Sequence, residues 1–190
     1  PGTKVRKLHT SKRDAFKVVN GNAFAKIYPN RIEKLSEYNV RNSHKIKKDI
    51  SFEEKVALVK FYPGMDFGIL DYYVKNKYKG IVLEMTGLGH VASKRARLGW
   101  TKKLKEVQKK GLIICGVSQC IYGRTDPLVY SNGREILETG VIYLEDMLAE
   151  TALVKLGYVL GHNEWAKNKE VIKEKMLTNF AHELSDRLEQ

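Results

Sequence analysis

Residues 80–91, GIVLEMTGLGHV, decide the fold class of this chain. The segment opens with the apolar run 81–83, typical of a buried strand, and breaks at Gly87 and Gly89. A buried strand ending in a glycine loop is how open α/β sheets form an edge at which ligands bind. Polar side chains gather only at the loop end: Glu84, Thr86 and His90. The segment predicts either a ligand site at this edge or a β–α connection that needs glycine only for its turn. A β–α connection is the more frequent structural role of a lone G-x-G motif.

The neighbouring segments place this strand in a βαβ series. Short apolar strands are predicted at 56–61, 80–84 and 112–115. Helices are predicted at 67–77, with Asp66 as its N-cap, and at 101–110, ended by Gly111. Nearly all-apolar strands alternating with helices indicate a parallel sheet covered on both faces. We therefore predict an α/β fold, a three-layer α-β-α domain with a small parallel sheet.

The C-terminal third continues this pattern. A long loop at 118–130 precedes a short helix at 132–138, a longer helix at 147–160 that begins at Asp146, and a final helix at 167–177. The polar tail 178–190 is expected to be ordered by a partner. Lys155 lies on an otherwise apolar helix, and we interpret it as a structural residue paired with Glu150 or Asp146.

The first 50 residues differ from the rest. A short helix is predicted at 12–19 with Thr10 or Ser11 as N-cap, and strands at 23–28 and 31–35. Residues 31–50 have no core face and are predicted to be a linker. Lys and Arg number 13 against 4 Asp and Glu in 1–50, and 21 against 18 in 51–190. This basic portion is compatible with nucleic acid, with an acidic protein surface, or with a plain solvated surface.

Composition excludes several classes. Hydrophobic content of 43% and charged content of 29% are those of a globular protein, and no apolar run is long enough to span a membrane. No signal peptide is recognisable, and the absence of an initial Met suggests a fragment or a processed product. Cys115 and Cys120 do not make a disulfide framework or a zinc site, so no metal is expected. Cys120 is expected to be a small buried hydrophobic residue.

Three stretches together resemble a known family. They are LEMTGLGHV at 83–91, VSQCIYGRTDPLVYSNGREIL at 117–137 and GVIYLEDMLAETALVKLGYVLGH at 140–162. They are similar to the C-terminal half of type I L-asparaginases. Within that family they most resemble the GatD group, the glutaminase subunits of archaeal glutamyl-tRNA(Gln) amidotransferases, as do MLTN at 176–179 and GTKVRKLHTSKRDAF at 2–16. Met85 departs from the family, which usually has glycine there.

The resemblance implies a domain organisation and a catalytic residue. Residues 1–30 would be the end of the N-terminal amidohydrolase domain, an arm; residues 31–50 would be a linker, and 51–190 the asparaginase-like C-terminal domain. The family's nucleophilic threonine in TGGT and its Thr-Asp pair in GTDT do not occur in this sequence. Aligning residues 14–16 with the family places its catalytic lysine at Lys7, with Lys4 and Arg6 expected to lower the Lys7 pKa. Without the resemblance, Lys7 would be an ordinary surface lysine.

The resemblance also implies a function. The family group hydrolyses glutamine and passes ammonia to a second amidotransferase subunit, GatE, which uses ATP and Mg to amidate Glu-tRNA(Gln) in the cytoplasm. This chain would bind no cofactor, would form a homodimer within a heterotetramer with GatE, and would be inactive by itself. His90, Gly87 and Gly89 would border the neighbouring subunit's substrate site, although His90 as a simple loop residue stays open. A free-standing L-asparaginase, or a non-catalytic asparaginase-like module whose basic arm binds tRNA, are the alternatives.

Overall fold

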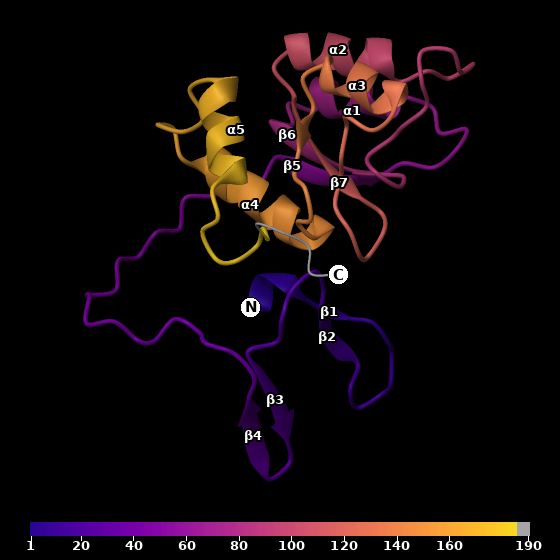
Figure 1. The fold of residues 1–190 in the computed structure, drawn as a ribbon. Helices are drawn as coiled ribbons and strands as arrows, with labels where there is room; N and C mark the ends of the chain where they lie inside the picture. The colour runs from indigo at the N-terminus through magenta and orange to yellow at the C-terminus, as the bar shows by residue number, and fades with distance from the viewer. Residues whose placement is uncertain (186–190) are drawn as a thin grey trace.

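A computed structural model describes residues 1–185 (Figure 1). A 3₁₀ turn, η1, covers Gly2–Lys4, and four short strands follow: β1 Val5–Lys7, β2 Phe16–Val18, β3 Ala25–Tyr28 and β4 Arg31–Lys34. The remaining elements alternate between strands and helices: β5 Val56–Lys60, α1 Ile69–Lys75, β6 Gly80–Met85, α2 Thr101–Lys109, β7 Ile113–Ser118, α3 Ser131–Leu137, β8 Ile142–Tyr143, α4 Ala149–Gly161 and α5 Lys169–Leu177.

The main sheet is parallel, with strand order β5-β6-β7-β8. Val56 pairs with Gly80 and Gly80 with Ile113, so the carboxyl ends of β5, β6 and β7 meet at one edge. Strand β8 was not expected from the sequence, because two residues carry too little periodicity to be recognised. The predicted α/β fold with a small parallel sheet is confirmed.

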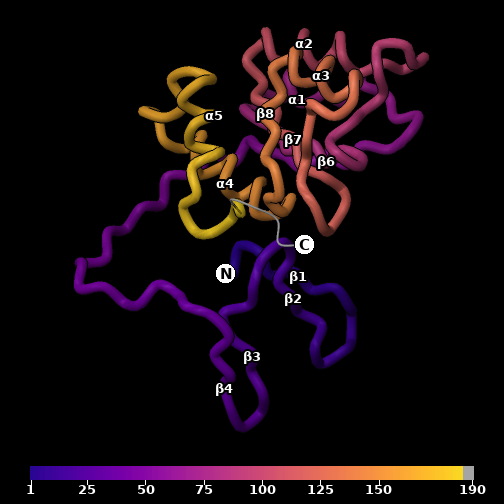
Figure 2. Tube along the Cα trace, viewed as in Figure 1, coloured from indigo at the N-terminus to yellow at the C-terminus, as the bar shows by residue number. Residues whose placement is uncertain are grey.

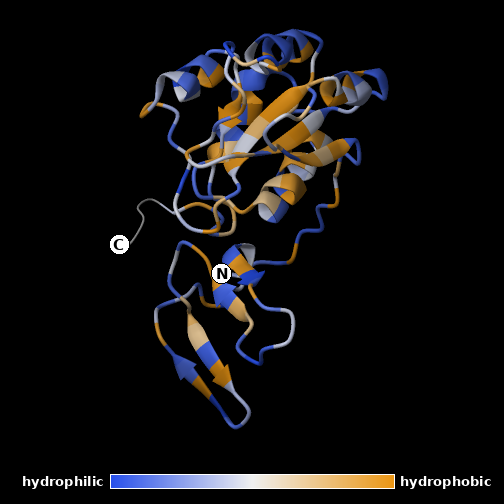
Figure 3. Ribbon diagram, turned by 90° about the vertical axis from the view of Figure 1, so that its right-hand side faces the viewer, coloured by the Kyte–Doolittle hydropathy of each residue, from blue (hydrophilic) through white to orange (hydrophobic). Residues whose placement is uncertain are grey.

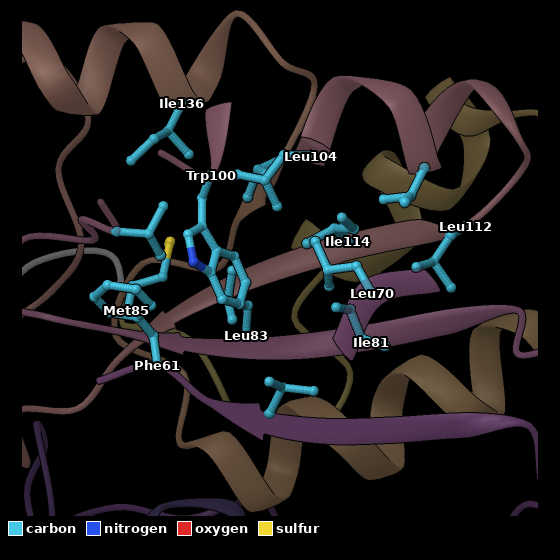
Figure 4. Packing of buried hydrophobic residues seen from close by; sticks show 14 of the residues in the cluster. Phe61, Leu70, Ile81, Leu83, Met85, Trp100, Leu104, Leu112, Ile114 and Ile136 are labelled. Atoms are coloured by element: carbon cyan, nitrogen blue, oxygen red, sulfur yellow. The ribbon is translucent and has the colours of Figure 1, made fainter. Parts of the chain in front are cut away.

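Helices cover both faces of this sheet. Helices α1, α2 and α3 lie together on one side, and α4 and α5 on the other, as Figures 1 and 2 show. Side chains alternate along each strand, so Ile81, Leu83 and Met85 join the core under the first group, whereas Val82 joins the core under α4 and α5. Hydrophobic residues concentrate in the sheet in Figure 3, and Figure 4 shows Trp100 and Phe61 packed against it. The three-layer arrangement follows from this two-sided burial.

Several helix ends differ from the sequence prediction. The helix expected at 67–77 begins later, at Ile69, and Asp66 instead accepts a 2.7 Å hydrogen bond from the Gly68 N–H just before it. Helix α4 begins at Ala149, and the predicted start at Asp146 is wrong because the backbone is still extended at Leu148, with ψ of 145°. The predicted end of α2 is confirmed, since Gly111 follows it with φ of +93°.

The first 34 residues form two antiparallel hairpins, β1–β2 and β3–β4, which we call the N-terminal arm. The helix predicted at 12–19 is wrong. Phe16 pairs with Lys7 in β2, and the turn is organised by His9, whose Nδ1 accepts hydrogen bonds from the N–H groups of Ser11 and Lys12. The boundary predicted after residue 30 passes through the β3–β4 hairpin.

The segment that joins the arm to the sheet domain is exposed at 37–50 and docks at its end. Phe52 packs over Gly157 of α4, and the Glu53 N–H donates to the Gly157 carbonyl at 2.9 Å. Asp49 accepts a hydrogen bond from His162 Nε2 at 2.9 Å. Glycine at 157 and 161 is required by this close approach, because a Cβ at either position would overlap Phe52.

Candidate functional site

The loop after β6 is a tight turn closed on itself. Thr86 and His90 form an antiparallel bridge, with the His90 N–H donating to the Thr86 carbonyl at 2.9 Å. Gly87 and Gly89 have φ of +51° and +103°, values that residues with a Cβ rarely adopt. A Cβ on Gly89 would lie 2.5 Å from Tyr143 Cε1, whereas a Cβ on Gly87 would meet no atom within 4 Å. Packing therefore accounts for glycine at 89, and backbone conformation for glycine at 87.

Side chains from neighbouring strands fix this loop in place. The Tyr143 hydroxyl of β8 donates to the Gly89 carbonyl at 2.8 Å, and the Ser118 hydroxyl donates to the Gly87 carbonyl at 2.6 Å. Gln119 Nε2 donates to the carbonyls of Phe61 and Glu84, which joins the ends of β5 and β6. The carboxyl edge of the sheet is thus a rigid platform.

His90 is the titratable side chain of this loop. Its ring lies 5.5 Å from the Tyr130 ring in an edge-on arrangement, and its Nε2 is buried without a hydrogen-bond partner within residues 1–185. Burial lowers the pKa of His90, so the neutral imidazole is favoured near pH 7. An unpaired buried nitrogen of this kind is uncommon, and nothing within residues 1–185 satisfies it.

The N-terminal arm is joined to the sheet domain by a buried ion pair. Lys4 Nζ lies 2.6 Å from Asp146 Oδ2, and the two side chains are 3% and 0% exposed. The other oxygen of Asp146 accepts a 3.0 Å hydrogen bond from the Ser185 N–H, and the Ser185 hydroxyl donates to the Asn20 carbonyl at 2.8 Å. Asp146 therefore connects the arm, the start of α4 and the C-terminal segment.

Further contacts complete this junction. Arg6 pairs with Glu150 at 3.0 Å, and Asn20 exchanges two hydrogen bonds with the backbone of Gly123. A cavity of about 10 Å³, space for about one water, lies between Arg6, Asn20, Glu84 and the loop 145–149. Around this cavity the arm is packed closely against the carboxyl edge of the sheet.

Lys7 lies on the other side of strand β1 from Arg6, because successive side chains of a strand alternate. Its side chain is exposed, and its Nζ lies 5.8 Å from the centre of the Phe16 ring. Lys4 and Arg6, the cations expected to act on Lys7, are instead held by Asp146 and Glu150. Within residues 1–185, no hydrogen bond or ion pair joins Lys7 to Gly87, Gly89 or His90, so the structure does not gather the four into one site.

Two other sequence predictions are wrong. Lys155 pairs with Glu183 at 2.5 Å rather than with Glu150 or Asp146. Burial opposes ionisation of Glu183, but hydrogen bonds from Lys155 and from the backbone N–H groups of Phe180 and Ala181 outweigh it and lower the pKa of Glu183. Cys120 is exposed, whereas Cys115 is buried. Burial raises the pKa of the Cys115 thiol to about 12 and leaves it unreactive.

The departure at Met85 has a packing explanation. Its side chain is fully buried and its methyl group occupies the space that a Cβ on Gly116 would need. The same methyl lies 3.3 Å from where a Cβ of Gly89 would be. Met85 thus fills the volume beneath the loop that glycine leaves open at these two positions.

Neither a metal cluster nor a spanning helix is found in the described part of the chain. Within residues 1–185, no three His, Cys, Asp or Glu side chains gather closely enough to bind a metal ion. In the same residues no helix has the length and apolar character needed to cross a membrane.

The fold and its carboxyl edge define a class: a three-layer α/β domain with a glycine loop held at the end of its second strand. Residues 55–176 match the Glutaminase/Asparaginase C-terminal domain, and the chain belongs to this family. An amidohydrolase family is therefore established for it.

Relatives and solved structures agree with this assignment. The chain is 48% identical over 186 residues to the glutamyl-tRNA(Gln) amidotransferase subunit GatD of Pyrococcus abyssi, covering 97% of this chain and 41% of that protein. It is 43% identical over 190 residues to GatD of Methanococcus maripaludis, covering 97% and 43%. The chain thus spans about two fifths of the length of these relatives. The thermostable L-asparaginase from Thermococcus kodakarensis superposes with a TM-score of 0.86 at 26% identity, covering 98% of this chain and 54% of that one. L-asparaginase I from Vibrio cholerae gives 0.80 at 25% identity, covering 97% and 54%.

Sequence reasoning missed the residues that fix the arm. Lys4 and Asp146 are 142 positions apart, and nothing distinguishes Lys4 from the other 12 basic residues of 1–50. The usable signal was the acidic pair Glu145-Asp146, which lies between the apolar residues Leu144 and Met147. A carboxylate in such a place is rarely buried without a partner.

Proposed function

We propose that this chain is the C-terminal part of the glutaminase subunit of a tRNA-dependent amidotransferase. In that reaction, ammonia released from glutamine converts Glu-tRNA(Gln) to Gln-tRNA(Gln). The observation that carries the proposal is the 48% identity over 97% of the chain to a GatD protein. The solved L-asparaginases share the fold at a lower identity of 26%.

In the proposed domain organisation, this chain supplies only part of the catalytic site. In this proposal residues 1–30 complete the first, catalytic domain, residues 31–50 are the linker, and 51–190 are the second domain. The nucleophilic threonine and its Thr-Asp pair are supplied from outside these 190 residues. The exposed apolar side chains of the arm, Phe16 at 65%, Ile27 at 81% and Ile32 at 72%, fit a segment that packs against a further domain.

Lys7 is the proposed catalytic residue of this chain. A threonine hydroxyl is a weak nucleophile and needs a neighbouring base to take its proton before it attacks the glutamine carboxamide. A lysine can act in this way when burial or a neighbouring charge adjusts its pKa. The ion pairs of Lys4 and Arg6 hold strand β1 in place, and Lys7 projects from its other side toward the proposed position of the first domain.

The loop 86–90 is proposed to border the substrate site of a neighbouring subunit. Its rigid attachment to Tyr143 and Ser118 would allow Gly87 and Gly89 to present backbone, and the half-buried His90 its imidazole ring, at a fixed position. A two-fold homodimer would bring this wall to the other copy's threonine. The proposed assembly adds GatE, which would use ATP and Mg, and would act on tRNA in the cytoplasm.

An assay of glutamine hydrolysis tests this function. The 190-residue chain is expected to show no turnover by itself, and turnover is expected when the residues that precede it in its relatives are supplied. Addition of GatE and tRNA should then couple ammonia release to amidation of Glu-tRNA(Gln). Glutaminase turnover by residues 1–190 alone, or a reconstituted protein that never amidates Glu-tRNA(Gln), would contradict the proposal.

A free-standing L-asparaginase is the second candidate, and the fold match to two L-asparaginases favours it. The two candidates differ in substrate and in dependence on partners. Hydrolysis of asparagine at a rate that ignores GatE and tRNA would favour the asparaginase. A non-catalytic module remains the third candidate, and it requires that neither amide be hydrolysed in any combination.

A further inference from the structure

Positive charge in the sheet domain is concentrated in one segment. Residues 94–110 carry eight Lys or Arg and one Glu, a net charge of +7. The rest of 51–190 carries 13 basic and 17 acidic residues. The basic character of this domain therefore belongs to helix α2 and to the loop that precedes it.

Helix α2 turns its lysines to solvent. The helix contacts both α1 and α3, and the three lie together in Figure 1. Leu104 and Val107 are fully buried on its inner face. Lys102, Lys105 and Lys109 are all exposed. Their spacing of i, i+3 and i+7 places them on one face, over about 10 Å of helix at 1.5 Å per residue.

The two other lysines of residues 101–110 are already neutralised. Lys103 pairs with Asp71 at 3.0 Å and with Glu106 at 3.1 Å, and Lys110 pairs with Glu106 at 2.7 Å. Within residues 1–185, none of Lys102, Lys105 and Lys109 has an ion-pair partner. Glu106 is the one carboxylate of α2, and because Lys103 and Lys110 hold it, Lys102, Lys105 and Lys109 are left as unpaired cations.

The loop 93–99 adds two more unpaired cations beside the start of this helix, because its third cation, Lys94, pairs with Glu135 at 3.0 Å. Arg95 and Arg97 are exposed, and neither has an ion-pair partner in the described part of the chain. The loop is closed by the backbone N–H of buried Trp100, which donates to the Ala92 carbonyl at 3.0 Å. It is also tightly folded at Gly99, where a Cβ would lie 2.5 Å from the Ser93 carbonyl oxygen. The two guanidinium groups therefore project from a compact turn rather than from a loose segment.

We propose that these five residues form a binding surface for the phosphate backbone of RNA. We call it the basic strip: Arg95, Arg97, Lys102, Lys105 and Lys109. A row of cations that have no ion-pair partners matches a polymer with regularly repeated negative charges, and Lys and Arg contacts to phosphate are the main source of such binding.

Other acidic partners fit the strip less well. Amphipathic helices that bind a lipid surface insert an apolar face among the lipids, and the apolar face of α2 is buried in the core. The centre of a protein interface is enriched in aromatic residues and depleted in lysine, whereas the strip has no exposed aromatic residue among 94–110. The choice of RNA over DNA rests on the proposed function, which needs tRNA as a substrate of the complex.

The strip is separate from the basic N-terminal arm. Helix α2 covers one face of the sheet, whereas Thr3 and Arg6 of the arm contact Thr151 and Glu150 of α4, which lies on the other face. In the sequence, the excess of positive charge is most evident in residues 1–50. The structure distinguishes the two regions, because the strip lies on a rigid helix packed into the core.

Fluorescence anisotropy with labelled tRNA, measured over a series of KCl concentrations, tests the proposal. The strip variant replaces all five residues by Gln: R95Q, R97Q, K102Q, K105Q and K109Q. A control variant with the same charge change replaces five exposed residues of the arm and linker: K12Q, R13Q, K26Q, K45Q and K48Q. The strip variant is expected to bind about 100-fold more weakly, with the slope of log K against log salt reduced by about 4. The control variant is expected to stay within about threefold of the original protein.

Three outcomes would overturn the proposal. They are equal weakening by both variants, greater weakening by the control, and no salt-dependent tRNA binding by the original protein. The same variants are also tested with vesicles of phosphatidylcholine and phosphatidylserine. Strip-dependent binding to these vesicles without binding to tRNA would also contradict the proposal. The single variants K102Q and K109Q should each lower the slope by about 1, and they serve if the fivefold variant does not fold. Glutamine hydrolysis is not part of the readout, so failure here is distinct from failure of the proposed function.

Discussion

The sheet domain and the N-terminal arm of this chain are stabilised in opposite ways. Residues 55–176 enclose two apolar clusters, one on each face of a parallel sheet. The arm consists of two hairpins of three- and four-residue strands whose apolar side chains, such as Ile27 and Ile32, are largely exposed. Isolated hairpins of this size are at most marginally stable in water. The sheet domain can fold from its own core, whereas the arm depends on what it touches.

Substitution in the core should give the largest effect and sharpen this difference. Trp100 is fully buried, its ring lies 5.3 Å from that of Phe61, and its Nε1 donates to the Met65 carbonyl at 3.1 Å. Trp100→Ala is expected to lower the free energy of unfolding by about 3–5 kcal/mol. Ile27→Ala, at a side chain 81% exposed, should cost less than about 0.5 kcal/mol. Urea denaturation followed by circular dichroism measures both, and equal costs would show that the arm has its own core.

Breaking the buried ion pair should release the arm while the sheet domain stays folded. Asp146→Asn removes the charge that Lys4 faces at 2.6 Å, and an unpaired buried ammonium costs about 3 kcal/mol or more. Hydrogen exchange should therefore become faster in residues 1–20 and stay slow in β6 and β7. The double variant Lys4→Met, Asp146→Leu removes both charges and should recover part of the protection. Unchanged exchange in the arm of the single variant would show that other contacts hold it.

The glycine loop offers a finer test of the rigid platform at the sheet edge. Gly89→Ala forces a methyl group against Tyr143 and requires a positive φ, so a loss of about 1–3 kcal/mol is expected. Gly87→Ala faces open space and should cost only about 1 kcal/mol, from its φ of +51°. Thermal unfolding of the two variants measures which substitution lowers the stability more. A larger loss at Gly87 would mean that the loop does not pack on Tyr143.

The attachment of the linker end, residues 49–53, to α4 should depend on pH. We expect this effect on stability to be the smallest of those predicted here. Burial lowers the pKa of His162, but hydrogen bonds with the Tyr158 carbonyl and with Asp49 outweigh it and leave this pKa raised. The hydrogen bond from His162 lowers the pKa of Asp49. A raised His pKa gives stability that is complete below the ordinary value of 6.5 and is lost as pH rises through the folded pKa. A lowered Asp pKa gives stability that is present above 3.8 and is lost as pH falls through the folded pKa.

The attachment is therefore expected to be strongest between these two ordinary values and weaker at about pH 8. Hydrogen exchange at residues 49–53 across this range measures it. The variant Asp49→Asn should remove the pH dependence. Dependence that persists in this variant would assign the effect to another group, such as Glu164, which also acts on His162.

The sequence predicted the sheet domain far better than the arm, for a physical reason. Runs such as Ile81-Val82-Leu83 and Leu112-Ile113-Ile114 encode burial on both faces within a few residues, so three of the four parallel strands were predicted. In the arm, Phe16–Val18 is a strand only because it pairs with Val5–Lys7, and local propensity could not exclude a helix at 12–19.

The candidate site shows the same limit. The positive φ values at Gly87 and Gly89 fit the expected turn, but the partners Asp146 for Lys4 and Glu183 for Lys155 are 142 and 28 positions away. Likewise, the lysines of 94–110 were visible in the sequence, but their division into paired and unpaired cations depends on Asp71 of α1. Long-range ion pairs leave no periodic signal in a sequence.

The arm matters to the proposed function because it carries Lys7, and one measurement tests that most directly. Glutamine hydrolysis is measured for the protein reconstituted with its proposed first domain, comparing Lys7→Met with Lys12→Met, a matched exposed lysine of the same hairpin. Lys7→Met is expected to lower kcat at least about 100-fold, the scale of a lost proton-transfer group, with the fold and the arm's hydrogen exchange unchanged. Lys12→Met is expected to keep kcat within about twofold. Equal activity of the two variants would contradict the assignment of Lys7 and, with it, the role given to the arm.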